Sequence, residues 1–231
     1  MIRENMDRVR ERILSACARS SRNPNEITLV AVTKTHPAKV IKEAFEAGVK
    51  DIGENRVQEA LRKFLELATT NYQLPTINWH LLGHLQTNKV KPAVKMFDLI
   101  QSLDSLKLAL EIEKEAGKID KIQDCLIEVK TSFEETKSGA AEENLLPLLE
   151  GIKGLKHVRI KGLMTIAPYG TDARPYFRKL YALREKLGAI TFPESIGFGI
   201  LSMGMTGDFE TAIEEGSTMV RIGRAIFGER V

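Results

Sequence analysis

Strand-like and helix-like runs alternate along almost the whole chain of 231 residues. Short, β-branched apolar runs predict strands, whereas longer runs with apolar residues three or four apart predict helices. Strands are expected at 27–34, 50–53, 77–83, 98–103, 123–131 and 158–166, within 197–205, and at 218–223. Helices are expected at 3–20, from Pro37 to about Gly48, and at 55–68, 88–96, 105–117, 141–153, 173–188 and about 207–215. Such alternation is typical of a parallel sheet with helical crossovers.

The number of βα units narrows the fold further. About eight units follow one another, and no Pro/Gly/Ser-rich linker separates them. Eight units in a chain of this length fit a closed barrel better than an open doubly wound sheet. The sequence therefore predicts an α/β protein with one domain, residues 1–231, folded as a single TIM-type (β/α)8 barrel. The additional helix at 3–20 is expected to cover the bottom or the side of the barrel.

Composition excludes several classes of partner. The 34 basic and 31 acidic residues leave a net charge of +3, too small for the concentrated basic face of a nucleic-acid-binding protein. Cys17 and Cys125 have neither metal-ligand nor disulfide-framework spacing, and free thiols are typical of a reducing compartment. No signal peptide and no apolar run long enough to cross a bilayer is visible. We therefore expect a cytoplasmic protein that binds neither nucleic acid nor membranes.

Lys34 is the clearest candidate for chemistry, because sites in such barrels lie at the carboxyl ends of strands. Val30, Val32 and Lys34 share one face of the first strand. If both valines fill the barrel interior, the lysine points into its mouth. Burial there would favour the neutral amine, which attacks an aldehyde. The alternative is a lysine at a strand end whose amine simply reaches solvent.

Two glycine-containing loops follow the last two strands, where such barrels usually bind phosphate. Arg221 shares a strand face with Met219 and is therefore also expected near the mouth. Gly223 follows that strand, and a helix beginning after it would favour an anion. The preceding loop adds three candidate donors, Ser202, Gly204 and Thr206. Either loop alone also has a steric explanation, since glycine is common in tight turns.

Other polar residues near strand ends have open alternatives. Asn55 either lines a pocket or caps the following helix. His80 either lines a pocket or is a hydrogen-bonded core histidine. Glu128 and Lys137 either orient a ligand or belong to a solvated charge cluster. The four histidines have no metal-site spacing, so no metal is expected.

Eight segments resemble, in order, motifs of the pyridoxal phosphate homeostasis proteins. They are VAVTKTHP (30–37), GENRVQEA (53–60), WHLLGHLQTNKVK (79–91), QSLDS (101–105), KSG (137–139), GLMTIAP (162–168), LSMGMTGD (201–208) and VRIGRAIFGER (220–230). These matches span nearly the whole chain. The resemblance implies the barrel of the alanine racemase N-terminal domain without that enzyme's C-terminal β domain.

The resemblance also implies roles around pyridoxal 5′-phosphate (PLP). Lys34, the lysine of VAVTK, would hold the cofactor as a Schiff base, and Arg221 would face the pyridine nitrogen. Because arginine can only donate hydrogen bonds, it would leave that nitrogen unprotonated and weaken the ring as an electron sink. Asn55 is expected beside the cofactor. The remaining expected contacts outside the phosphate site are His80 and Met164.

The cofactor phosphate is expected at the two loops. The resemblance assigns Ser202 and Met203 in the first loop, and Gly223 and Arg224 in the second. The position of Arg224 often holds a small hydroxyl residue in the family. A hydroxyl contact is therefore lost here, and a backbone N–H or the guanidinium would take its place.

These expectations favour a PLP carrier that maintains the intracellular cofactor pool without catalytic turnover, acting as a monomer and supplying PLP-dependent apo-enzymes. The alternative is an amino-acid racemase, which needs an acid/base on each face of the substrate. Lys34 can serve one face, but the chain lacks the domain that supplies the second group in alanine racemase. Of the four tyrosines, only Tyr169 follows a strand. A metabolic isomerase on a phosphate-binding barrel would leave the pairing of Lys34 with Arg221 unused.

Overall fold

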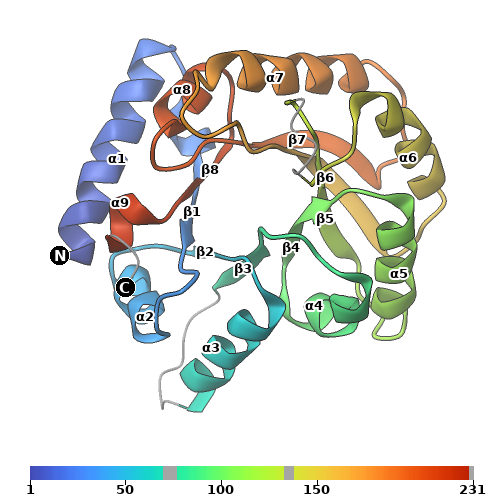
Figure 1. The fold of residues 1–231 in the computed structure, drawn as a ribbon, viewed down its shortest axis with the longest axis horizontal. Helices are drawn as coiled ribbons and strands as arrows, with labels where there is room; N and C mark the ends of the chain where they lie inside the picture. Colours follow the sequence, from blue (N-terminus) through green and yellow to red (C-terminus); the bar gives the residue numbers. More distant parts are fainter. Residues whose placement is uncertain (70–76, 133–137, 229–231) are drawn as a thin grey trace.

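Eight parallel strands close into a barrel in the order β1 to β8, and helices surround it (Figure 1). The computed structural model describes residues 1–69, 77–132 and 138–228. Closure occurs where β1 pairs with β8. The strands are β1 (Thr28–Val32), β2 (Asp51–Glu54), β3 (Asn78–Leu81), β4 (Leu99–Leu103), β5 (Gln123–Glu128), β6 (Val158–Met164), β7 (Ile196–Ser202) and β8 (Met219–Ile222). The predicted (β/α)8 barrel is confirmed.

Helices α1 to α8 occupy the predicted stretches with shifted ends, and the short α9 follows Gly223. They are α1 (Ile2–Arg19), α2 (Lys39–Glu46), α3 (Val57–Thr69), α4 (Val90–Met96), α5 (Leu106–Gly117), α6 (Leu145–Ile152), α7 (Arg174–Gly188), α8 (Phe209–Glu214) and α9 (Arg224–Phe227). Short 3-10 turns precede β1, α4 and α6. Among the described residues, no helix combines the length and apolar character needed to cross a membrane.

Two apolar layers stabilise the barrel. The larger one lies between the sheet and its helices and includes the buried faces of α1, α3 and α7. The smaller one fills the barrel interior, where Ile200 packs against five buried residues: Val30, Leu99, Leu126, Met164 and Met219. Because side chains alternate along a strand, the residues two positions after Val30, Leu99 and Met219 continue toward the carboxyl-terminal mouth. This interior apolar layer therefore lies directly beneath the polar residues of the mouth.

The strand predicted over 27–34 ends earlier, at Val32. After Thr33 the chain leaves the sheet, and Thr35 adopts a left-handed φ of 68°. Lys34 consequently lies in a tight turn just beyond β1 rather than at the last position of the strand.

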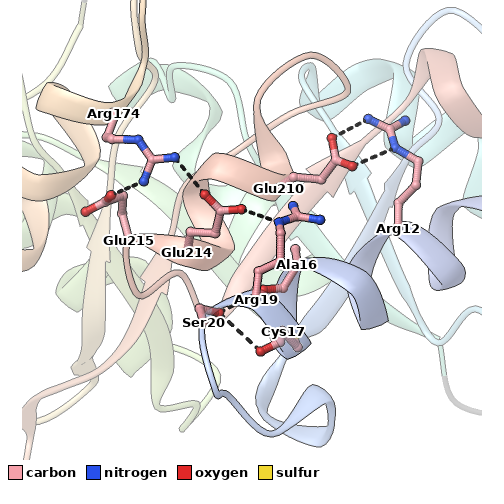
Figure 2. A network of polar contacts seen from close by, with 9 residues as sticks. All are labelled: Arg12, Ala16, Cys17, Arg19, Ser20, Arg174, Glu210, Glu214 and Glu215. Atoms are coloured by element: carbon pink, nitrogen blue, oxygen red, sulfur yellow. Dashed lines mark hydrogen bonds and ion pairs between the residues drawn. The ribbon is translucent and has the colours of Figure 1, made fainter.

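Helix α1 covers the side of the barrel, where it packs against α8 and α9 (Figure 1). Ion pairs fix this arrangement, as Figure 2 shows. Arg12 donates to Glu210 through Nε at 3.2 Å and Nη2 at 2.8 Å. Glu214 accepts from Arg19 Nε at 2.8 Å and from Arg174 Nη2, on α7, at 2.6 Å. Helix α8 is therefore held between α1 and α7, and this also anchors the loop that precedes it.

Glu214→Gln is expected to lower the free energy of unfolding at pH 7 by about 0.5–1 kcal/mol. Hydrogen bonds from Arg174 and then Arg19 lower the pKa of Glu214 below its ordinary value. A carboxylate with a lowered pKa stabilises the fold above its unfolded-state pKa, and this stabilisation is lost as the pH falls through the folded-state pKa. The difference between variant and parent in urea unfolding should therefore shrink below about pH 4.

The matched control is Glu150→Gln, which removes the ion pair between Glu150 and Lys153. The side chain of Glu150 is 57% exposed and that of Lys153 is 52% exposed. Its effect is expected to stay within about 0.5 kcal/mol, because exposed pairs contribute little. A loss in Glu214→Gln that is equally large at pH 3 and pH 7 would show that the ion pairs are not its cause.

Candidate functional site

A cavity of about 650 Å³ opens at the carboxyl ends of the strands. Ligand pockets are commonly of this size. It is bordered by the segments that follow β1, β2, β3, β6, β7 and β8, as expected for a barrel of this type. Five of the nine residues expected to bind the cofactor lie along it: Lys34, Asn55, Arg221, Gly223 and Arg224. The fold thus brings together residues nearly 200 positions apart in the chain.

Lys34 is half-buried at the side of this cavity. The geometry beneath it is the predicted one, since Val30 is fully buried in the barrel interior and Val32 lines the cavity. Asn55, which follows β2, is also half-buried and lines the cavity. An amine in this place can reach a ligand while its stem packs against apolar side chains.

Arg221 extends from β8 above Met219, and only 4% of its surface is exposed. Nη1 donates to Ser202 Oγ at 2.6 Å, and Nη2 donates to the carbonyl oxygen of Thr165 at 2.8 Å. Burial lowers the pKa of Arg221 to about 10, against the opposing effect of Asp208. The guanidinium therefore stays charged at neutral pH, and it places a hydrogen-bond donor that cannot accept at the inner end of the cavity.

A buried chain of hydrogen bonds holds Arg221 across the barrel. Ser202 Oγ donates to Gln101 Oε1 at 2.6 Å, and Gln101 Nε2 lies 2.9 Å from His80 Nδ1. His80 Nε2 lies 3.0 Å from Asp51 Oδ1. Because an amide nitrogen only donates, Nδ1 of His80 accepts and Nε2 holds the proton in this arrangement. His80 and Ser202 therefore do not line the cavity themselves; they connect Arg221 to β2 through buried polar groups.

Asp51 in this series of hydrogen bonds was not predicted from the sequence, and neither was Gln101. Gln101 lies two positions after Leu99, on the same inward face of β4. A polar residue on the inward face of a buried strand was the available signal, because such a group must find hydrogen-bond partners inside the barrel.

Gln101→Leu is expected to lower the free energy of unfolding by about 2–3 kcal/mol, because it leaves polar atoms of His80 and Ser202 buried without their partner. Gln86→Leu, at an exposed position, is the control and should stay within about 0.5 kcal/mol. Urea unfolding of both variants measures the difference. Equal, small effects would mean that the chain through Gln101 adds no stability.

The loop after β7 reaches the cavity through Met205, Thr206, Gly207 and Asp208. Asp208 Oδ1 accepts from the Met205 N–H at 2.6 Å and closes this turn. Gly204 just before it has φ +95°, and a Cβ there would lie 2.5 Å from Ala212 Cβ. Only glycine therefore allows the loop to bend this tightly against α8.

The loop after β8 meets this first loop. The Ala225 N–H donates to Thr206 Oγ1 at 3.4 Å, so the start of α9 contacts the loop after β7. Gly223 and the exposed Arg224 line the cavity from this side. A hydroxyl, two glycines and a cation consequently gather at one end of the cavity, which is a suitable set of groups for an anion.

Two residues of the expected set face other surroundings. Met203 is fully buried in the layer between sheet and helices, and its N–H donates to the Met219 carbonyl oxygen at 3.1 Å. Met164 is fully buried in the barrel interior beneath the mouth. The cavity lining among the described residues includes neither side chain.

The residues with open alternatives are placed as follows. Glu128 is only 4% exposed, its Oε1 accepts from Ser138 Oγ at 3.0 Å, and burial raises its pKa. It is therefore not part of a solvated charge cluster. Lys137 lies outside the described residues, as does Tyr72, another of the four tyrosines. Tyr169 lines the cavity but is 90% exposed.

Comparison with known proteins identifies the family. Residues 2–231 match the family described as alanine racemase, N-terminal domain. A protein of Aquifex aeolicus (strain VF5) named pyridoxal phosphate homeostasis protein is 48% identical over 230 residues, which cover 98% of this chain and 97% of the relative. The chain belongs to the pyridoxal phosphate homeostasis protein family. The resemblance noted from eight sequence motifs is thereby confirmed.

Solved structures share the fold of this chain. The structure of PipY of Synechococcus elongatus PCC7942 with PLP bound is 35% identical to this chain, with a TM-score of 0.86 and coverage of 99% of this chain and 100% of PipY. Alanine racemase of Clostridium difficile 630 is similar in fold alone, at 15% identity and a TM-score of 0.77. This chain covers 56% of that racemase.

Proposed function

We propose that this chain binds PLP covalently through Lys34 Nζ, as a Schiff base, and serves as a non-catalytic carrier that maintains the cofactor pool. The observation that supports this most is the convergence of Lys34 and Arg221 on one cavity that also contains two glycine-containing loops. Membership of the homeostasis protein family and the PLP-bound structure of PipY support the same ligand.

The residues present fit the chemistry of this cofactor. PLP supplies an aldehyde that condenses with an amine, and an anionic phosphate that anchors it. Lys34 provides the amine at the side of the cavity. Thr206, Gly207, Gly223 and Arg224 provide donors and charge for the phosphate. Ser202 and Met203 do not line the cavity, so they would support this end of it through the residues that they contact.

Arg221 favours a carrier over a racemase. Its guanidinium stays charged and only donates, so a ring nitrogen facing it must accept a hydrogen bond and remain unprotonated. A racemase would also need a second acid/base held over the substrate. Tyr169, with 90% of its surface exposed, is not held in that way. The likeness to alanine racemase is a likeness of fold.

The proposal also concerns the state of the protein in the cell. We propose that residues 1–231 form one domain that works as a monomer in the cytoplasm and supplies PLP to apo-enzymes. The absence of any metal-ligand cluster among the described residues is compatible with this function. So are the two buried thiols, Cys17 and Cys125, which suit a reducing compartment.

The first test is a PLP titration of the purified protein, followed by its visible absorption spectrum and borohydride reduction. A band that borohydride bleaches, with the label located on Lys34 by mass spectrometry, is the expected result. Incubation with D- and L-alanine in D2O then separates carrier from racemase, since a racemase exchanges the Cα proton. Absence of any reducible adduct in excess PLP would refute the proposal.

A further inference from the structure

We infer that Glu59 and Lys63 of α3 are positioning residues for Lys34. Together with Glu54, they form hydrogen bonds with the residues that flank Lys34 in its turn. This inference rests on the proposed function of Lys34. It concerns a polar cluster behind the cavity rather than the cavity lining.

Lys63 is the centre of the cluster, and only 1% of its surface is exposed. Its Nζ lies 2.7 Å from the Thr33 carbonyl oxygen, 2.6 Å from Glu54 Oε1 and 2.8 Å from Glu59 Oε1. A lysine ammonium has three donors, and these three oxygens can accept all of them. A buried ammonium needs such complete pairing, and the geometry here supplies it.

The cluster forms hydrogen bonds with the residues on both sides of Lys34. On one side, Thr33 Oγ1 donates to Glu54 Oε1 at 2.5 Å, while the Thr33 carbonyl accepts from Lys63. On the other side, the Thr35 N–H donates to Glu59 Oε1 at 2.6 Å. Hydrogen bonds to the cluster thus fix the residue before Lys34 and the residue after it.

The turn depends on these hydrogen bonds because the backbone of Thr35 is strained. Its φ of 68° lies in the left-handed region, which a β-branched residue rarely adopts. Such a conformation persists only where its surroundings enforce it, and strained residues gather at functional sites. The hydrogen bond from the Thr35 N–H to Glu59 supports it here, together with the bond from the His36 N–H to the Thr33 carbonyl oxygen at 3.1 Å. We therefore expect Glu59 to control the direction in which Lys34 leaves the turn.

Charge complements the geometry. Burial alone would raise the pKa of Glu59, but hydrogen bonds from Lys63 and from the Thr35 N–H lower it below the ordinary value. Glu59 therefore remains an anion and a strong acceptor at neutral pH. A buried ion pair is weak evidence for stability as such, since apolar residues often stabilise as well. Its place beneath the reactive lysine is better explained by positioning.

The sequence contains a signal for this cluster. Among the described side chains of α3, the buried ones are Val57, Ala60, Lys63 and Leu67, which are three or four residues apart. Lys63 therefore occupies the apolar stripe of an amphipathic helix, where a lysine must have buried partners. Glu59, four residues before it, is the local one.

The test compares Glu59→Ala with Glu59→Gln, which keeps a carbonyl oxygen for the Thr35 N–H. Both retain the Lys63–Glu54 pair, so both are expected to fold. For Glu59→Ala we expect formation of the reducible PLP adduct to be about tenfold slower or more. Glu59→Gln should stay within about threefold of the parent. The affinity for pyridoxamine 5′-phosphate, which has no aldehyde, should change less than about twofold.

Two further variants separate positioning from general stability. Thr35→Gly combined with Glu59→Ala should recover the rate to within about threefold of the parent, because glycine adopts a positive φ without strain. Arg159→Met removes a partly exposed ion pair with Asp124 at the amino-terminal end of the barrel and should change neither rate nor affinity.

The outcomes distinguish the two proposals. Adduct formation by Glu59→Ala at the parent rate, or a parallel loss of pyridoxamine 5′-phosphate affinity, overturns the positioning role while the proposed function stands. A parent protein that forms no adduct at Lys34 overturns the proposed function, and the positioning role with it. A slow Glu59→Ala rescued by Thr35→Gly supports both.

Discussion

Lys34→Ala is expected to abolish the borohydride-reducible PLP adduct completely. Alanine has no amine, so no covalent link can form at this position. The other groups of the cavity remain, including Arg221, Arg224 and the two loops. The variant should therefore still bind PLP without a covalent bond, with an affinity lower by about tenfold or more. Absorption spectra before and after borohydride, with mass spectrometry of the reduced protein, measure the adduct directly.

The matched control for this variant is Lys39→Ala. Lys39 is an exposed lysine at the start of α2, five positions further along the chain. It should retain an adduct at Lys34 in the same amount as the parent. A reduced adduct of equal amount on another lysine of the Lys34→Ala protein would show that Lys34 is not the attachment site.

Lys63→Met is expected to cause the largest loss of stability, about 3–5 kcal/mol in the free energy of unfolding at pH 7. The carboxylate of Glu54 is fully buried, and within the described structure its Oε2 has no hydrogen-bond partner. Removing Lys63 takes the counter-ion from that carboxylate and a donor from the Thr33 carbonyl. Methionine fills a similar volume, so the cost comes from the unpaired charge rather than from a void.

The pH dependence of this loss follows from Glu54. Burial raises the pKa of Glu54 even with Lys63 present, against the hydrogen bonds of Lys63 and Thr33. Without Lys63 the pKa should rise further. A raised folded-state pKa favours the fold at low pH, and this contribution is lost as the pH rises through it. The deficit of Lys63→Met should therefore be largest at neutral pH and shrink toward pH 4–5, roughly the unfolded-state pKa of a glutamate.

Two comparisons test this explanation by urea unfolding. The double variant Lys63→Met with Glu54→Gln should recover more than half of the lost stability, because no buried charge is left. Lys114→Met removes a lysine that is 58% exposed and pairs with Glu111, and it should leave the urea midpoint of unfolding unchanged. A deficit that the second substitution does not relieve would point to packing instead.

The alternation of elements and the inward faces of β1 and β8 were readable in the sequence because they depend on local periodicity. Period-two apolar runs and helical stripes indicated eight βα units, and eight units at this length indicated a closed barrel. The same period placed Val30 and Val32 on one inward face, and Met219 with Arg221 on another, whereas Lys34 lies in the turn beyond β1. The motif resemblance added the family and its ligand.

Only the tertiary structure decided which polar residues face the cavity and which stand behind it. His80 and Ser202 belong to a series of hydrogen bonds that crosses the barrel to Arg221. Because these partners are far apart in the sequence, no local sequence pattern indicates that they interact. The first strand ends at Val32, and in the turn that follows both neighbours of Lys34 form hydrogen bonds with the cluster around Lys63. The apolar stripe of α3 indicates that Lys63 is buried, but it does not identify the partners of this lysine, because the Thr33 carbonyl and Glu54 belong to segments that only folding brings beside it.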